Sequence, residues 1–271
     1  MIRLFWLLLS LLPAWAAALP VAMSVLPQKT FVAGVGGPAV EALVVVPRGQ
    51  DPALYQPTPR QLVALGRARL YVRAGVPFEA SWLPRFRALN PGMAILDLRE
   101  GIPPLTAADG STDPHVWTDP LAMLTHVEKL AETLARLDPA HAEGYHDRAA
   151  RLATRIQALH EELSRALAPL RGKTFLVYHP AWAYFARRYG LHQLAVEHEG
   201  KAPAARTLAR LIERARQLGI DTLIVQPQHH NATAQAMARA LGARIVEVDP
   251  LAEDWFAGLR RMARVVQEAA R

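Results

Sequence analysis

Apolar and polar residues along this chain follow two periods that alternate from one end to the other. Short apolar runs are typical of buried strands, and we expect strands at residues 21–26, 40–46, 70–72, 94–98, 175–178, 194–197, 222–225 and 244–248. Between them, apolar residues recur at the spacing of one helix face, which predicts helices that begin at or near Pro59, Trp82, Pro120, Pro139, Ala181, Pro203, Asn231 and Leu251. Strands that alternate with helices indicate parallel pairing through βαβ units.

The longest periodic run lies in the middle of the chain. Asp138 and Pro139 end one helix and begin another, whose apolar positions are Tyr145, Ala149, Leu152, Ile156, Leu159, Leu163, Leu167 and Leu170. About 30 residues at 1.5 Å each predict a rod about 45 Å long, enough to run across two lobes. Its three histidines, His141, His146 and His160, do not share one face at i, i+4, and we expect them to be solvated.

These patterns predict an α/β fold of two lobes, each a mainly parallel sheet flanked by helices, joined by one long rigid helix. The expected divisions are residues 1–18, a signal peptide, residues 19–138, the N-terminal lobe, residues 139–171, the connecting helix, and residues 172–271, the C-terminal lobe.

The first 18 residues are those of an exported protein. Arg3 precedes an uncharged apolar run to Leu12, and small residues follow up to Ala18. This order is typical of a secretory signal peptide, with cleavage after Ala16 or Ala18, and the apolar run is too short to span a bilayer comfortably. The sequence contains no cysteine, which excludes disulfides, thiolate metal sites and a lipid-modified cysteine. We therefore expect a periplasmic protein without a lipid anchor.

The charge pattern does not indicate a polyanionic partner. The formal net charge is +7, but the arginines are spread along helices, as at Arg206, Arg210, Arg214 and Arg216, without a dense basic block. A stripe of basic residues interleaved with aromatic ones, which nucleic-acid binding would need, is missing from the sequence. We expect no nucleic-acid partner.

One histidine lies between two Asp-Pro pairs, in the stretch Asp-Pro-His-Val-Trp-Thr-Asp-Pro at residues 113–120. Proline fixes its own φ and disfavours helical geometry in the residue before it. We therefore expect His115 on a short, stiff, extended segment, followed by Asp119 as a helix N-cap and Pro120 as the first helical residue. A lone histidine in such a place is more often satisfied by a nearby carbonyl group than bound to a ligand.

Two further residues make a ligand site more plausible. His179 and Asp249 each follow a predicted strand and precede a proline, and open α/β sheets bind ligands outside the carboxyl ends of their strands. Either residue could simply cap the helix that follows it. Together with His115, however, they offer two imidazoles and one carboxylate, a set that suits zinc and tolerates manganese or iron.

Several motifs of the sequence recur together in one protein family. They lie, in order, at residues 49–52 with 55–59, residues 113–120, residues 178–185 with 189–190, residues 197–203 and residues 248–251. In these stretches the sequence resembles the periplasmic solute-binding proteins of zinc and manganese ABC importers, the cluster A-I family. The resemblance covers essentially the whole mature chain. It implies a metal ion in a cleft between two lobes, an inner-membrane ABC permease as partner, and a monomer.

The resemblance also implies which residues bind the ion, and where this chain departs from the family. His115, His179 and Asp249 match three ligand positions, but the histidine expected after Asp51–Pro52 is Ala53, which has no donor atom. The histidine-rich loop of many zinc-binding members is absent as well. Water could fill the fourth position, His229 or His230 could move into it, or affinity could be low. For His229 and His230 an exposed loop pair is the simpler interpretation.

The leading functional hypothesis is capture of a divalent transition metal, zinc first, and its delivery to a permease, without enzymatic activity. A relative with weakened metal binding that serves as an adhesin or chaperone is an alternative, supported only by Ala53. A zinc hydrolase is a third class, because three protein ligands plus water form the catalytic pattern. Against it, the sequence lacks the His-Glu-x-x-His spacing that marks a general base.

Overall fold

The computed structural model describes residues 17–106, 110–197, 204–229 and 232–270. The predicted signal peptide lies outside the described residues except for its last two positions, and the first strand begins directly after it, at Leu19. None of the helices in these described ranges is long and apolar enough to cross a membrane.

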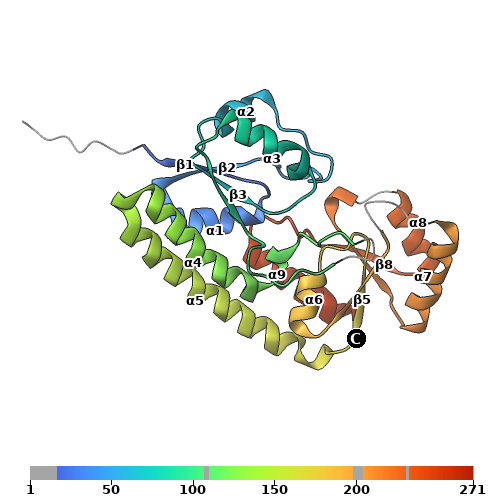
Figure 1. Ribbon diagram of the computed structural model, residues 1–271. Coiled ribbons are helices and arrows are strands. Elements are labelled where there is room, and N and C mark those ends of the chain that lie inside the picture. The colour runs from blue at the N-terminus through green and yellow to red at the C-terminus, as the bar shows by residue number, and fades with distance from the viewer. Residues whose placement is uncertain (1–16, 107–109, 198–203, 230–231, 271) are drawn as a thin grey trace, which may run out of the picture.

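Two four-stranded sheets form the framework, one in each half of the chain (Figure 1). In the first half the order is β2-β1-β3-β4, with β1 at Leu19–Met23, β2 at Val40–Val44, β3 at Leu70–Arg73 and β4 at Ala94–Asp97. In the second the order is β6-β5-β7-β8, with β5 at Thr174–Val177, β6 at His192–Ala195, β7 at Thr222–Val225 and β8 at Arg244–Glu247. All strand pairs are parallel, which confirms the α/β prediction.

The two sheets repeat one topology, and this determines where a ligand can bind. In each sheet the first strand pairs with the second on one side and with the third on the other, so the chain reverses its direction of progress between them. The loops after these strands diverge and leave a crevice at the carboxyl edge, the usual ligand position in open α/β sheets.

Nine helices of the described chain surround the sheets. They are α1 (Pro27–Gly36), α2 (Pro59–Leu65), α3 (Phe78–Leu89), α4 (Pro120–Leu137), α5 (Ala142–Leu167), α6 (Ala183–Tyr189), α7 (Ala205–Gln217), α8 (Ala232–Leu241) and α9 (Trp255–Ala269). Helix α1 was not predicted, because its glycines indicated a turn. One glycine does end the helix: the C-cap residue Gly37 takes a φ of 57°, which glycine adopts without strain.

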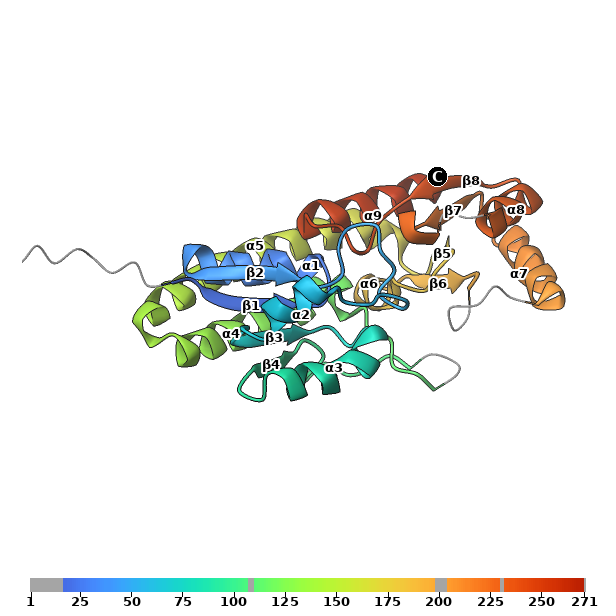
Figure 2. The ribbon, with the colours of Figure 1, turned by 90° about the horizontal axis from the view of Figure 1, so that it is seen from above.

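The predicted long helix is present as α5, flanked by 3-10 turns at Pro139–His141 and Ala168–Leu170. Its 26 residues span about 39 Å. The predicted apolar stripe from Tyr145 to Leu167 is buried, and it packs against α1 and α4 of the first half and α9 of the second (Figures 1 and 2). The long helix therefore joins the two halves, as predicted.

The histidines of the long helix differ in their exposure. His141 and His146 are exposed, as expected. His160 is half-buried, with its ring stacked on Tyr189 of α6 at a centroid distance of 5.8 Å, so the expectation of a solvated His160 is wrong. The error arose because α6, which covers this part of α5, is distant in the sequence.

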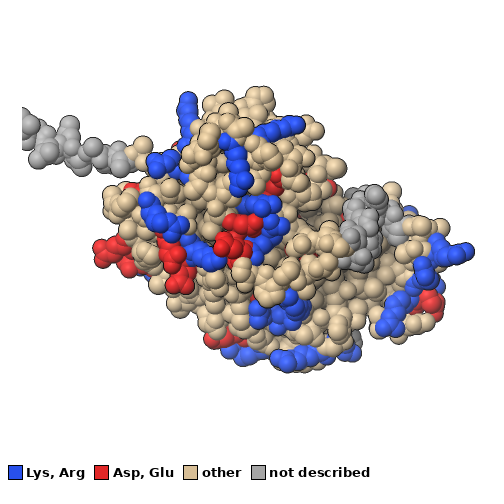
Figure 3. Space-filling model, viewed as in Figure 1, with Lys and Arg blue, Asp and Glu red and all other residues tan. Residues whose placement is uncertain are grey.

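Basic residues are spread over the surface. On the face shown in Figure 3, Lys and Arg side chains lie over several elements and alternate with Asp and Glu over much of the first half. The four arginines of α7, which the sequence showed to be spread along a helix, are all exposed.

Helix α4 contains a buried histidine whose protonation should oppose folding. His126 is 2% exposed, and neither ring nitrogen has a hydrogen-bond partner among the described residues. Burial, with a smaller contribution from the charge of Lys129, lowers the pKa of His126 to about 4, while Asp97 acts in the opposite direction. The side chain is therefore neutral in the folded protein at pH 7.

We expect His126 to reduce stability in acid. Its folded-state pKa lies below the unfolded value, so the stability present above about pH 6.5 is lost as the pH falls towards 4, on the order of 3 kcal/mol in all. Urea unfolding at pH 7 and pH 4.5 measures the free energy of unfolding of wild type and His126→Leu. Relative to wild type, the variant should be more stable at pH 4.5 than it is at pH 7. The control, His146→Leu, changes an exposed histidine and should track wild type. A pH-independent difference for His126→Leu would contradict this account.

Candidate metal centre

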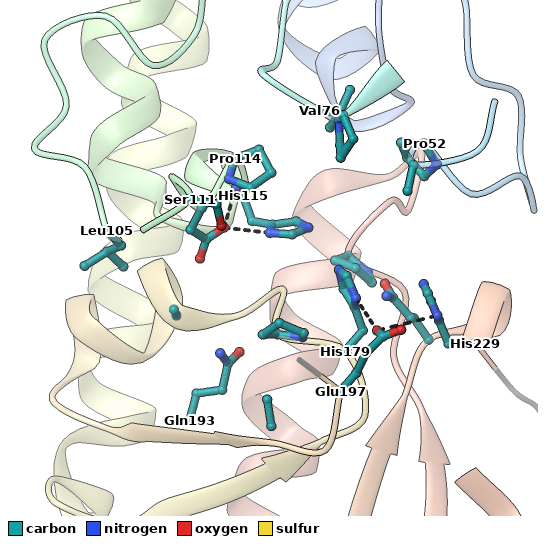
Figure 4. Close-up of a pocket in the computed structure, with 18 of the residues that line it drawn as sticks. Pro52, Val76, Leu105, Ser111, Pro114, His115, His179, Gln193, Glu197 and His229 are labelled. Atoms are coloured by element: carbon teal, nitrogen blue, oxygen red, sulfur yellow. Dashed lines mark hydrogen bonds and ion pairs between the residues drawn. The ribbon is translucent and has the colours of Figure 1, made fainter. Parts of the chain in front are cut away.

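A cavity of about 670 Å³ lies at the carboxyl ends of the strands, between the two halves (Figure 4). The first half contributes the loop after β2, the loop after β3 and the segment that carries His115. The second half contributes the segments that follow β5, β6 and β7 and the loop after β8. The residues on its wall that could bind a metal ion are Asp51, Asp113, His115, His179, Glu197 and His229.

His115 is held by its neighbour Asp113. The Asp113 carboxylate accepts the backbone N–H of His115 at 2.8 Å and contacts its ring Nδ1 at 2.7 Å. These bonds close a local turn, and His115 has φ −78° and ψ 37° at the start of a 3-10 turn over Val116–Thr118. The prediction of an extended His115 segment is therefore wrong. The prediction of Asp119 as N-cap is confirmed, because its carboxylate accepts the Leu121 N–H at 3.0 Å.

Two tryptophans fasten the His115 segment to the second half. The indole N–H of Trp117 donates to the carbonyl of Pro250 at 2.9 Å, and that of Trp255 donates to the carbonyl of Trp117 at 2.6 Å. Trp117 is 1% exposed, and its ring lies 5.1 Å from that of His115. The position of His115 relative to the second sheet is therefore set by buried, satisfied polar groups.

His179 is held in the same way by Glu197. The two residues follow the neighbouring strands β5 and β6, and His179 Nδ1 lies 2.6 Å from Glu197 Oε2. Burial raises the pKa of the Glu197 carboxyl, but the hydrogen bond and charge of His179, with the charge of His229, outweigh it, and the net pKa shift is downward. An imidazole bonded to a carboxylate through Nδ1 presents Nε2 as a metal ligand with a fixed orientation.

The structure brings His115 and His179 together. Their ring centroids are 5.4 Å apart and their planes cross at 77°, and Figure 4 shows both in the cavity. Two imidazoles bound to one tetrahedral zinc ion have ring centres roughly 5 Å apart, given zinc–nitrogen bonds of about 2.0–2.1 Å. Little movement is needed for one ion to bind both.

Asp249 occupies a different position. Its Oδ1 accepts the backbone N–H of Leu251 at 2.9 Å and the side-chain amide of Gln228 at 3.4 Å. Pro250 and Leu251 lie on the described wall of the cavity, whereas Asp249 does not. Burial raises the pKa of the Asp249 carboxyl against the opposing effect of these hydrogen bonds. The prediction that Asp249 follows a strand is confirmed, but its carboxylate does not line the cavity that contains the two imidazoles.

His229 is a part of the site that the sequence did not favour. Its side chain is 14% exposed, and its ring lies parallel to that of His179, with centroids 4.8 Å apart and an interplanar angle of 12°. Burial lowers the pKa of His229, and the nearby charge of His179 acts in the same direction. The expectation of an exposed loop residue is wrong for His229, and His230 lies outside the described residues. Ala53 lies on the cavity wall with no donor in its side chain.

Comparison with known proteins identifies the family. The family model for the zinc-uptake complex component A, periplasmic (ZnuA), matches residues 21–269. The chain belongs to the ZnuA family. The predicted resemblance to periplasmic metal-binding components of ABC importers is thereby confirmed.

Solved ZnuA structures share the whole fold. A crystal structure of ZnuA superposes with a TM-score of 0.89 at 36% identity and covers 94% of this chain and 100% of that one. A ZnuA deletion mutant with zinc bound gives a TM-score of 0.88 at 36% identity and covers 93% of this chain and 98% of that one.

A relative is also found by sequence. The high-affinity zinc uptake system protein ZnuA of Paracoccus denitrificans (strain Pd 1222) is 38% identical over 120 residues, 44% of this chain and 37% of that protein.

Proposed function

We propose that this protein captures a divalent transition metal ion, zinc in the first place, in the cavity between its halves and delivers it to an ABC permease in the inner membrane. One observation carries the proposal. His115 and His179 approach each other across the cavity, and each is fixed through Nδ1 by its own carboxylate, Asp113 or Glu197. Both Nε2 atoms are thus left for a shared ion. Family membership supports the same role, that of a transport component rather than an enzyme.

The proposed ligands from the sequence are His115, His179 and Asp249. Two neutral nitrogens and one anionic oxygen suit zinc, with manganese or iron as further candidates. The hydrogen bonds described for Asp249 use Oδ1, and Oδ2 is the atom we assign to the ion. Because Asp249 does not line the cavity, its segment has to move towards the two imidazoles for Oδ2 to reach the ion.

The proposal includes the state of the mature protein. We propose cleavage of a signal peptide after Ala16 or Ala18, no lipid anchor, and a monomer of two lobes divided as predicted at residues 138 and 172. The start of β1 at Leu19 and the absence of cysteine support the first two points. The intact mass of the periplasmic protein tests the cleavage site and the absence of a lipid, and light scattering tests the monomer.

The decisive experiment measures metal content and uptake. Protein purified without a histidine tag and stripped with a chelator should take up one zinc ion per chain, as measured by calorimetry at micromolar protein. Titration with manganese and iron under the same conditions ranks the competing ions. No zinc uptake by wild type at this concentration would refute the proposed function.

A further inference from the structure

We propose that His229 is a direct ligand of the bound metal ion in this protein, and that Glu197 is a positioning residue for both His179 and His229. This inference rests on the proposed function and extends it to residues that follow β6 and β7. It starts from a cluster of His179, Glu197 and His229 whose potential ligand atoms all lie within 4.8 Å of one another.

The topology of the second sheet explains why these three side chains meet. The strand order β6-β5-β7 places the ends of three neighbouring strands side by side, and Glu197, His179 and His229 follow β6, β5 and β7 respectively. Pro227 begins a 3-10 turn that ends at His229, and the His229 ring packs against Tyr178 and His179, the two residues that follow β5. The crevice between β5 and β7 is the switch point where ligands are expected in such sheets.

Contacts on both sides fix the ring of His229. It packs against Tyr178 at a centroid distance of 6.3 Å and lies parallel to His179 at 4.8 Å. Glu197 Oε2 lies 2.6 Å from Nδ1 of His179 and 3.8 Å from Nδ1 of His229. Both rings therefore turn Nδ1 towards the same carboxylate, and both Nε2 atoms lie on the opposite edge, as Figure 4 shows for the arrangement around Glu197.

The edge of His229 that carries Nε2 faces the first half of the molecule. His229 Nε2 is 4.0 Å from Asp51 Oδ2, and the other oxygen of Asp51 accepts the backbone N–H of Ala53 at 2.8 Å. Two ligand atoms of one tetrahedral zinc ion are roughly 3.3–3.5 Å apart. The potential ligand atoms of His229 and His179 lie within 4.8 Å of each other, so a small inward movement brings them to this spacing, on the side of the cavity where Ala53 offers no donor.

The alternative is that His229 only packs, filling space beside His179. The two accounts differ in what the ion contacts. Cadmium-113 in the zinc site couples to the ring nitrogens that bind it, and a cadmium–nitrogen correlation spectrum of wild type identifies each ligand. We expect signals from His115, His179 and His229, with His229 coupled through Nε2. A spectrum in which His115 and His179 couple and His229 does not would overturn the inference and leave the proposed function intact.

Affinity provides a second, independent measurement. His229→Ala should weaken zinc binding by more than the roughly 10–100-fold typical of residues that only support a ligand, measured by competition with a chelator. The matched control is His192→Ala, because His192 is an exposed histidine at the start of β6. Circular dichroism establishes that each variant is folded. If His229→Ala binds zinc like the control, the inference fails; if wild type itself binds no zinc, the proposed function fails.

The positioning role of Glu197 is tested by comparing a variant that removes its hydrogen-bond acceptor with one that keeps part of it. Glu197→Leu removes the hydrogen-bond partner of His179 and the carboxylate that lies 3.8 Å from Nδ1 of His229, and it should cost about 10–100-fold in zinc affinity. Glu197→Gln keeps a carbonyl oxygen at the same reach, so it should recover most of that loss if orientation is the role of Glu197. Equal affinities of the Gln and Leu variants would exclude a positioning role.

Ala53 allows a double-mutant cycle. If His229 occupies the coordination position facing the loop of residues 51–53, Ala53→His should add little to wild type and should restore zinc binding to His229→Ala. The two changes are then strongly non-additive, which is the signature of a shared position. Additive effects would mean that His229 and the introduced histidine do not compete for one position, and the inference would be wrong.

Discussion

His115→Ala and His179→Ala are each expected to abolish stoichiometric zinc uptake at micromolar protein. Each change removes an imidazole whose Nδ1 is bonded to a carboxylate and whose ring centre lies 5.4 Å from that of the other imidazole. Zinc prefers four ligands in its protein sites, and loss of a pre-oriented nitrogen cannot be made up by the methyl group of alanine. Calorimetric titration of the stripped variants should show no saturable binding where wild type binds one ion.

His146→Ala is the control, because this exposed histidine on α5 lies outside the cavity wall, and it should bind zinc like wild type. Asp249→Asn examines the third proposed ligand: affinity should fall if Oδ2 binds the ion and should stay unchanged if Asp249 only caps the loop after β8. Retention of wild-type affinity by either His115→Ala or His179→Ala would show that the ion lies elsewhere, although the family assignment would stand.

The elements of the fold could be predicted because their signals are local. Thr58 and Gln61 form a capping box at the start of α2, with Pro59 as the first helical residue, and Asp119 caps α4. Each of these signals is complete within four residues of sequence. The apolar period of α5 is likewise continuous along the chain. Helix α1 was not predicted, because Gly34, Gly36 and the C-cap Gly37 indicated a turn and outweighed a short apolar stripe.

Other features depend on contacts that no local pattern encodes. Asp119 was predicted as a cap, but its carboxylate also forms a two-bond ion pair with Arg188 of α6, at 2.7 and 2.8 Å. This pair joins the start of α4 to the second half of the molecule. The capping role of Asp119 could be predicted from its neighbours in the sequence, whereas its ion pair with Arg188 depends on the tertiary fold.

The residues of the site also fall into two groups, those that local sequence predicts and those that depend on the tertiary fold. His115 and His179 could be identified because each precedes or follows a proline at the boundary of an element. The roles of Glu197 and His229 follow from the strand order β6-β5-β7, which cannot be read from one sequence. A usable signal did exist: Glu197 is the last residue of the strand predicted at 194–197, and His229 lies four residues after the strand predicted at 222–225. Residues at neighbouring strand ends meet at one edge of the sheet.

The wall of the cavity in the first half depends on a buried carboxylate. The Glu79 side chain is 0% exposed and accepts hydrogen bonds from Ser24, from the Arg73 guanidinium at 2.8 Å, and from the backbone N–H groups of Ala74 and Gly75 at 2.8 and 2.9 Å. These last two bonds shape the loop after β3. Gly75 has φ 84°, and together with the next two residues it lines the cavity.

Glu79→Leu is therefore expected to lower the free energy of unfolding by about 3–5 kcal/mol, because each buried donor left unpaired costs about 1–3 kcal/mol. Arg73 is spared part of this cost, since it is partly exposed and keeps a bond to Asp97 at 3.1 Å. Glu79→Gln retains one acceptor oxygen and should fall between wild type and the Leu variant. Urea unfolding at pH 7 measures all three.

The matched control for Glu79 is Glu100→Leu. The Glu100 side chain is 68% exposed and contacts Lys129 only at 3.7 Å, and exposed ion pairs of this kind contribute about 0–1 kcal/mol. A loss for Glu79→Leu no larger than that for Glu100→Leu would show that the network around Glu79 is not a source of stability. If Glu79→Leu loses stability as expected, Glu79 holds the loop after β3 in place. The zinc affinity of folded Glu79→Gln should then show how far the cavity depends on that loop.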